Sequence, residues 1–208
     1  MEAFNQACTL CPRLVDFLAQ VKDKYPDYYC LPVAPVGVKK PRLLIVGLAP
    51  GLHGANATGR PFTGDSSGIL LYETLYKFGY SNKPKSVSPT DGLKLKGCQI
   101  TNAVKCLPPQ NKPTTDEIKT CSAYLEAELK SLKAGTAVLA LGAIAHDSIL
   151  RALRLKKRDY PFGHEQVHQL PSDLWLVDSY HCSRYNTQTK RLTPEMFHRV
   201  FEVIAGLT

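Results

Sequence analysis

Short apolar runs alternate along this chain with longer stretches in which apolar residues recur at helical spacing. The runs are too short for helices and are rich in Leu, Val, Ile and Ala, which favours buried strands. The expected strands are residues 43–46, 98–104, 137–142 and 175–180. The expected helices are residues 68–78, 118–132, 143–155 and 194–205.

Two of these helices carry recognisable start signals. Thr114 and Glu117 have the spacing of a capping box before the helix at 118–132. Thr193 is a good N-cap, and Pro194 suits the first helical position that follows it. Alternating strands and helices with nearly continuous apolar strands predict an α/β fold, a three-layer α/β/α sandwich around a mostly parallel sheet.

The polar and glycine-rich segments follow the strands. A glycine-rich loop comes after the first strand, Asn102 lies near the end of the second, and His181 follows the last. In open parallel sheets the ligand crevice lies beyond the carboxyl ends of the strands. The sequence therefore predicts a functional site at this edge.

The loop at residues 47–65 contains five glycines and two prolines, so its backbone can bend sharply and approach a ligand closely. One interpretation is a generic phosphate cradle. The loop does not match Gly-x-x-x-x-Gly-Lys-Ser/Thr or Gly-x-Gly-x-x-Gly, which lowers support for binding of ATP or a dinucleotide.

Four side chains near these strand ends each have a structural and a functional interpretation. Asp65 is placed to cap the following helix, or to act in a site. Phe62 can fill the core, or stack on a flat ring. Asn102 can form an Asx-turn, or pair with a base edge, because its amide offers both a donor and an acceptor. His181 is either an ordinary buried histidine or a functional one.

Length and charge narrow the class of protein. The chain has 208 residues, the size of one domain, and a net charge of +8, which suggests a polyanionic partner such as nucleic acid or an acidic membrane surface. No stretch approaches the roughly 20 apolar residues of a membrane span. The N-terminus lacks a basic start and an apolar run, so we expect a cytoplasmic protein.

Seven cysteines in a reducing compartment are not expected to form disulfides. Cys8 and Cys11 form a Cys-x-x-Cys pair, which suits one side of a metal centre that takes two further ligands from elsewhere. Composition alone permits a zinc site as readily as an iron–sulfur cluster. Cys30 and Cys98 can be small buried hydrophobes.

Two segments bear a resemblance to a known family. The first is Gly47-Leu48-Ala49-Pro50-Gly51-Leu52-His53-Gly54, continued by Gly59-Arg60-Pro61-Phe62-Thr63-Gly64-Asp65. It resembles the first motif of the uracil-DNA glycosylase superfamily, and especially its family 5, or type B, branch. The second, His181-Cys182-Ser183-Arg184-Tyr185-Asn186-Thr187, is similar to that family's His-Pro-Ser-x-x-Asn motif.

The resemblance implies roles for particular residues. Asp65 and His181 would be catalytic, Asp65 by orienting water and His181 by donating to the oxyanion that develops on the base. The implied substrate-binding residues are Gly47, Ala49, Gly51, Phe62, Asn102 and Ser183. The implied DNA-binding residues are Arg184, Tyr185 and Asn186.

The resemblance also implies a cofactor. Families 4 and 5 carry a 4Fe–4S cluster on four cysteines, which here would be Cys8, Cys11, Cys106 and Cys121. We expect the cluster to be structural. Residues 1–208 would then form a single domain in which the N-terminal segment 1–40 helps to bind it.

The implied reaction is hydrolysis of the N-glycosidic bond of uracil after the nucleotide has been flipped out of the DNA stack. No motif places a lysine for Schiff-base chemistry, so the enzyme would be monofunctional and leave an abasic site. A permissive pocket that also accepts deaminated purines such as hypoxanthine is implied. We expect the partner to be double- and single-stranded DNA with deaminated bases, and the protein to be a monomer that does not bind membranes.

Three positions depart from the family pattern. Leu48 stands where the family 4 relatives have a glutamate, which leaves Asp65 as the best carboxylate for activating water. Cys182 replaces the usual proline, and Tyr185 replaces a more usual polar residue in the pair Arg184-Tyr185, where the resemblance implies the DNA wedge.

Two other classes of function compete with this one. The first is a non-catalytic nucleic-acid-binding protein with a structural iron–sulfur or zinc site. The second is a metal-bound hydrolase of free nucleotides, which is weakened because the chain lacks the His-x-Glu and Cys-x-x-Cys combination of zinc deaminases.

Overall fold

The computed structural model describes residues 4–208 and contains one six-stranded sheet with the order β1-β3-β2-β4-β6-β5. The central strands β3, β2, β4 and β6 are parallel, and the edge strands β1 and β5 are antiparallel to their neighbours. The strands are β1 (Val36–Gly37), β2 (Leu43–Gly47), β3 (Cys98–Asn102), β4 (Ala137–Leu141), β5 (Val167–Gln169) and β6 (Trp175–Ser179).

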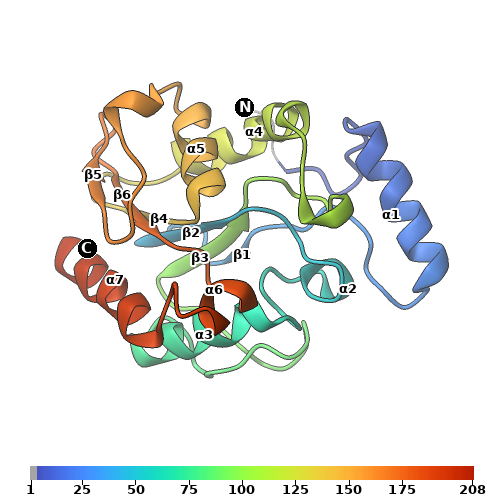
Figure 1. The fold of residues 1–208 in the computed structure, drawn as a ribbon, viewed down its shortest axis with the longest axis horizontal. Coiled ribbons are helices and arrows are strands. Elements are labelled where there is room, and N and C mark those ends of the chain that lie inside the picture. Colours follow the sequence, from blue (N-terminus) through green and yellow to red (C-terminus); the bar gives the residue numbers. More distant parts are fainter. Residues whose placement is uncertain (1–3) are drawn as a thin grey trace.

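Helices cover both faces of the sheet (Figure 1). The helices are α1 (Pro12–Lys24), α2 (Ala55–Thr58), α3 (Ser66–Lys77), α4 (Thr115–Lys130), α5 (Ala143–Ala152), α6 (Arg184–Gln188) and α7 (Pro194–Leu207). Short 3₁₀ turns lie at Pro109–Asn111 and Lys157–Asp159. The predicted three-layer α/β/α sandwich is therefore confirmed.

Strand alternation divides the interior into two cores. In β2, Leu43 and Ile45 pack with α3 and α7 on one face of the sheet. Leu44 and Val46 point the other way and pack with α4 and α5. Because successive residues of a strand face opposite sides, an apolar run buried on both faces is what a central parallel strand requires.

Helix α1 lies to one side of these layers (Figure 1). Its buried face, Leu14, Leu18 and Val21, packs against residues of the segment 104–124, which include Cys106 and Cys121. This third cluster attaches the N-terminal segment to the connection between β3 and α4.

The predicted elements are all present, with small shifts at their ends. The second strand ends at Asn102 rather than at residue 104, and α5 ends at Ala152, shortly before Arg154 with φ +58°. The capping box forms as predicted, with Thr114 accepting from the Glu117 amide. No helix in the part of the chain that the structure describes is long and apolar enough to cross a membrane.

Candidate active site

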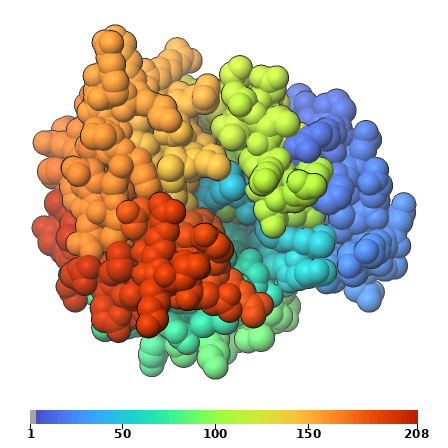
Figure 2. All heavy atoms as spheres, in the orientation of Figure 1, coloured from blue at the N-terminus to red at the C-terminus, as the bar shows by residue number. Residues whose placement is uncertain are grey.

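A cavity of about 400 Å³ opens at the edge of the sheet where β2, β3 and β6 end. Figure 2 shows this face hollowed between the orange-red segment near residue 185, the yellow-green segment near residue 110 and the cyan segment near residue 50. The residues that line the cavity are Leu48, Ala49, Gly51, Leu52, His53, Gly54, Ala55, Phe62, Asp65, Ser67, Asn102, Asn111, His181 and Ser183.

Seven of the predicted catalytic and substrate-binding residues line this cavity. They are Ala49, Gly51, Phe62, Asp65, Asn102, His181 and Ser183. Gly47, the eighth, lies behind the wall. A Cβ there would be 2.5 Å from Asn102 Oδ1 and 2.7 Å from Phe62 Cζ, so glycine leaves room for both side chains to reach the cavity.

Asp65 caps the following helix, as one of its two interpretations predicts, and its side chain also lines the cavity. Its Oδ1 accepts a hydrogen bond of 3.0 Å from the Gly68 amide and so caps α3. Its Oδ2 lies against Gly54, where a Cβ would be 2.3 Å away. Burial raises the pKa of this carboxyl, and the backbone amides of Gly68 and Ser67 partly offset that rise.

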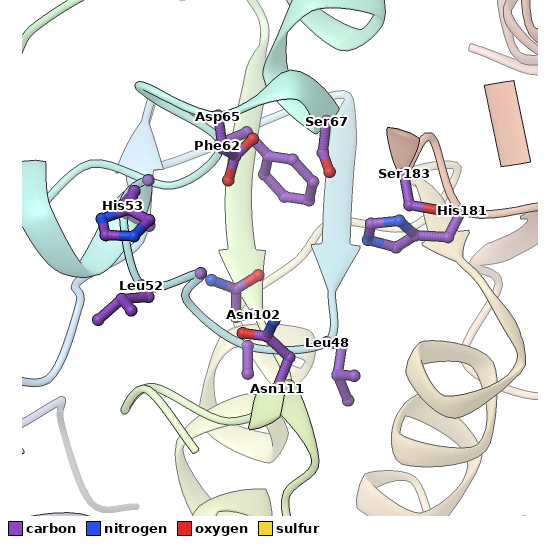
Figure 3. Close-up of a pocket in the computed structure, with 14 residues that line it drawn as sticks. Leu48, Leu52, His53, Phe62, Asp65, Ser67, Asn102, Asn111, His181 and Ser183 are labelled. Atoms are coloured by element: carbon purple, nitrogen blue, oxygen red, sulfur yellow. The ribbon is translucent and has the colours of Figure 1, made fainter. Parts of the chain in front are cut away.

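Phe62 forms one wall of the cavity, opposite His181 (Figure 3). The two rings lie 6.1 Å apart between centroids, at 30° to each other. The Phe62 backbone is in the left-handed region with φ +54°, and its carbonyl oxygen would be 1.9 Å from a Cβ at Gly68. Gly68 therefore permits a turn that brings the Phe62 ring to the wall of the cavity, at the edge of the core.

Asn102 ends β3 and is almost fully buried, with 3% of its surface exposed. Its Oδ1 has no hydrogen-bond partner among the described residues. A buried polar atom without a partner costs free energy, which a ligand that donates to it would recover. The alternative role of Asn102 as a turn residue does not explain this free oxygen.

His181 follows β6, and burial lowers its pKa to about 4. At neutral pH the ring is therefore uncharged and carries one N–H donor. No described residue hydrogen-bonds to the ring, whereas the His181 carbonyl accepts a 2.8 Å bond from Asn186 Nδ2. Asn186 thus braces the loop that carries the histidine.

The remaining residues of the second motif lie at the start of α6. Ser183 caps this helix by accepting from the Asn186 amide at 3.4 Å, and it also lines the cavity. Arg184 is exposed, and Tyr185 is 72% exposed. Both are on the surface beside Ser183, where DNA would have to approach, and their predicted contact with DNA stays a prediction.

Seven lining residues were not singled out as site members: Leu48, Leu52, His53, Gly54, Ala55, Ser67 and Asn111. The first five belong to the loop at residues 47–65, so a whole-loop assignment would have included them, and Ser67 lies at the start of α3 just beyond it. Asn111 gave no such signal. It reaches the cavity through a turn in which Gln110 and Asn111 both have positive φ, and no motif marks that turn.

The four predicted cluster ligands lie around a second cavity. Cys8, Cys11, Cys106 and Cys121 all line it, together with largely apolar residues of α1 and α4. Burial raises the pKa of Cys106 to about 12 and that of Cys121 to about 11. Within residues 4–208, no three His, Cys, Asp or Glu side chains form a ready-made metal-binding group.

A model of the uracil DNA glycosylase superfamily matches residues 34–205 of this chain. That range contains the whole sheet and every residue that lines the first cavity. The chain therefore belongs to the uracil DNA glycosylase superfamily.

Individual relatives show which types of enzyme within the superfamily this chain is similar to. The chain is 46% identical to the type-5 uracil-DNA glycosylase of Thermus thermophilus, over 99% of each chain. It is 42% identical to the type-5 enzyme of Pyrobaculum aerophilum, over 96% of this chain and 88% of that protein. The type-4 enzyme of Archaeoglobus fulgidus is 32% identical over 60% of this chain.

Proposed function

We propose that this protein is a uracil-DNA glycosylase of DNA repair, which hydrolyses the N-glycosidic bond of a flipped nucleotide and leaves an abasic site. The observation that carries the proposal is the cavity at the sheet edge, in which Asp65, His181, Asn102 and Phe62 surround one space. The type-5 names of relatives that match nearly the whole chain support the same conclusion.

Phe62 and Asn102 would recognise the base. The Phe62 ring offers a flat apolar surface for stacking, and the unpaired Asn102 Oδ1 accepts a hydrogen bond from a base edge. Such a contact to a buried polar atom discriminates strongly, because a base without the matching donor leaves the oxygen unpaired.

Asp65 and His181 would carry the chemistry. As the glycosidic bond breaks, the sugar gains positive charge and the leaving base gains negative charge. The neutral His181 ring donates its N–H to the base oxyanion. Asp65 Oδ2 orients water toward the sugar, offsets the positive charge, and accepts the proton that the water loses as its oxygen bonds to the sugar carbon. Leu48, which also lines the cavity, supplies no second carboxylate, so this work rests on Asp65.

The DNA itself would bind across the hollowed face (Figure 2). The exposed Arg184 and Tyr185 lie beside the cavity on α6, and the net charge of +8 favours contacts with phosphates. We propose that both double- and single-stranded DNA serve as substrates, and that the cavity also takes deaminated purines such as hypoxanthine. Its volume of about 400 Å³ lies within the usual range of ligand pockets. A monomeric cytoplasmic protein, folded as one domain over residues 1–208, fits this role.

The activity is tested by incubating the purified protein with a duplex that contains one uracil and scoring alkali-labile breaks at that position. We expect breaks only after alkali, as a monofunctional enzyme requires. DNA binding without breaks would instead support a non-catalytic nucleic-acid-binding protein, and release of product from free nucleotides would support a nucleotide hydrolase. Matched oligonucleotides with hypoxanthine, and single strands with uracil, test the breadth of the substrate.

We also propose that Cys8, Cys11, Cys106 and Cys121 bind a 4Fe–4S cluster. The four thiols line one cavity between α1 and α4, and thiolates are the ligands that such clusters take. The bound cluster would supply a structural cross-link between the N-terminal segment and the β3–α4 connection. The positive iron centre would also stabilise the thiolate forms, which burial alone disfavours.

The cluster is tested by visible absorption and iron analysis of anaerobically purified protein. We expect a brown preparation with about four iron atoms per chain. Cys106→Ala should lose the colour, whereas Cys98→Ala, which removes a buried cysteine of the α3–α7 core, should keep it. A colourless protein with bound zinc would contradict the proposal.

A further inference from the structure

The loop at residues 86–91 is bonded to the motif loop just beside Phe62. The Arg60 guanidinium donates to Ser86 Oγ and Asp91 Oδ1, both at 2.9 Å, and to the Pro89 carbonyl at 2.7 Å. The Arg60–Asp91 pair is nearly buried, since 8% and 11% of the two side chains are exposed. In the sequence this loop lies outside both motifs that carry the family resemblance, and neither Ser86 nor Asp91 lines the cavity.

The residue on the other side of Phe62 is bonded to the same loop. Thr63 Oγ1 lies 2.6 Å from Ser86 Oγ, so Ser86 contacts both Arg60 and Thr63. Pro61 is held as well, because the Tyr72 hydroxyl on α3 donates to its carbonyl at 2.9 Å. The positions that flank Phe62 are thus fixed, while the Phe62 ring faces the cavity.

Phe62 needs this support because its backbone is strained. A φ of +54° is uncommon for a bulky residue, and such a conformation persists only where the surroundings enforce it. In a relaxed conformation the ring would leave its position between Gly47 and His181. The hydrogen bonds to Ser86 and Asp91 are therefore well placed to hold the strained turn.

Asp91 is itself a rigid anchor. Its carboxylate accepts hydrogen bonds from the amides of Val87, Ser88 and Leu93, at 2.7, 3.2 and 2.9 Å. These bonds and Arg60 hold its pKa far below the usual range, so it stays ionised at physiological pH. A charged, pre-arranged acceptor fixes the planar guanidinium with little further ordering.

We propose that Ser86 and Asp91 are positioning residues, which hold Phe62 through Arg60 and Thr63 in the conformation that stacks on the flipped base. The proposal rests on the proposed glycosylase function. It places a determinant of base binding in a loop that has no contact with the base.

A double-mutant cycle with Phe62 tests the proposal. We expect Asp91→Asn and Ser86→Ala each to lower kcat/KM for uracil-containing DNA by about tenfold, mainly through KM, because the interaction they support is stacking. In a Phe62→Ala background the same changes should have almost no further effect, because the ring they position is gone. If each change lowers kcat/KM as much in the Phe62→Ala background as in the unaltered protein, the proposal is overturned.

Binding to DNA with a tetrahydrofuran abasic analogue separates positioning from general damage. That ligand has no base to stack on Phe62, so Asp91→Asn and Ser86→Ala should bind it as the unaltered protein does. Weaker binding of the analogue in parallel with the loss of kcat/KM would overturn the proposal. If Asp91→Asn does not fold, Ser86→Ala decides alone, because it leaves the Arg60–Asp91 pair intact.

Asp116→Asn is the matched control, since Asp116 is an exposed carboxylate that pairs with the nearby Lys119 on the surface of α4. It should change neither measurement. An unaltered protein that cleaves no uracil DNA would refute the proposed function itself, whereas an active protein with additive losses would refute only the role of the loop at 86–91.

Discussion

Two histidines near the same edge of the sheet have opposite surroundings. His146 on α5 is fully buried, and both of its ring nitrogens have partners, Asp178 Oδ1 at 2.8 Å and the Tyr160 carbonyl at 2.9 Å. His181 lines the cavity, and no described side chain or carbonyl bonds to its ring. The pKa of His146 is raised by Asp178 against the effect of burial, while burial alone lowers the pKa of His181 to about 4.

This difference indicates that His146 stabilises the fold, whereas His181 is available to a ligand. A buried polar group is tolerable when its partners lie within the protein, as they do around His146. The cavity instead combines the unbonded His181 ring with the unpaired Asn102 Oδ1, and it holds Asp65 with a raised pKa. Polar groups left without partners in a pocket are groups that a ligand can use. Changes at the cavity should therefore reduce activity, and changes at the His146–Asp178 pair should reduce stability.

The largest effect is expected at Asp65. Asp65→Asn keeps a side-chain acceptor for the Gly68 amide, so the cap of α3 and the melting temperature should be nearly unchanged. The carboxylate that orients water is lost, and we expect kcat to fall by about 1,000-fold while DNA binding remains. Single-turnover cleavage and binding to uracil-containing DNA measure the two effects. In the unaltered enzyme the rate should also fall as pH drops through the raised pKa of Asp65.

Near-normal cleavage by Asp65→Asn would remove the catalytic role of this carboxylate and leave it only as a helix cap. A large fall in melting temperature together with the loss of activity would show that Asp65 acts mainly as the cap of α3. Either result would weaken the distinction between the cavity, whose side chains serve activity, and the His146–Asp178 pair, which serves stability.

A smaller effect, on stability, is expected at the paired histidine. His146→Leu leaves Asp178 buried without its partner, and breaking such a pair costs about 3 kcal/mol of unfolding free energy or more. Urea unfolding measures this loss. At a temperature where the variant is folded, kcat/KM should stay within about twofold, because His146 does not line the cavity. His168→Gln is the comparison: the half-buried His168 ring bonds to the Pro161 carbonyl and contacts the rings of His146 and Tyr160, but it pairs with no described carboxylate, so the loss of stability should be smaller. A large loss of activity in a folded His146→Leu protein would contradict the assignment of a purely structural role.

Much of this architecture could be predicted from the chain alone. The central strands are buried on both faces and therefore appear as short apolar runs, and α4 and α7 begin at strong capping signals. The edge strands β1 and β5 have only two and three residues and were not predicted, because so short a segment carries no periodicity. Helix α1 was also missed. It begins at Pro12 without a side-chain cap, and its apolar face is explained only by packing on the β3–α4 connection.

The cavity was predicted to the extent that its residues follow strands. Asp65, Asn102 and His181 come from three strand ends that a parallel sheet must bring to one edge. Asn111 and the support from Ser86 and Asp91 could not be foreseen, because they depend on how irregular loops fold back. No local pattern encodes such contacts between distant loops.

The smallest effect concerns pH, and it tests the comparison of the two histidines directly. The ordinary pKa of histidine is 6.5, and that of folded His181 is about 4. Between these values the unfolded chain binds the extra proton, so His181 lowers stability as pH falls through this window. For His146 the folded pKa is raised, so its contribution is fully present below pH 6.5 and is lost as pH rises through the folded value. His181→Gln should therefore unfold less readily than the unaltered protein at pH 5, by about 2 kcal/mol, but not at pH 8. The loss in His146→Gln should be larger at pH 5 than at pH 8. Urea midpoints of both variants and of the unaltered protein are measured at pH 5 and pH 8. If both variants were stabilised, or both destabilised, at pH 5 relative to pH 8, the two rings would not differ in their electrostatic surroundings.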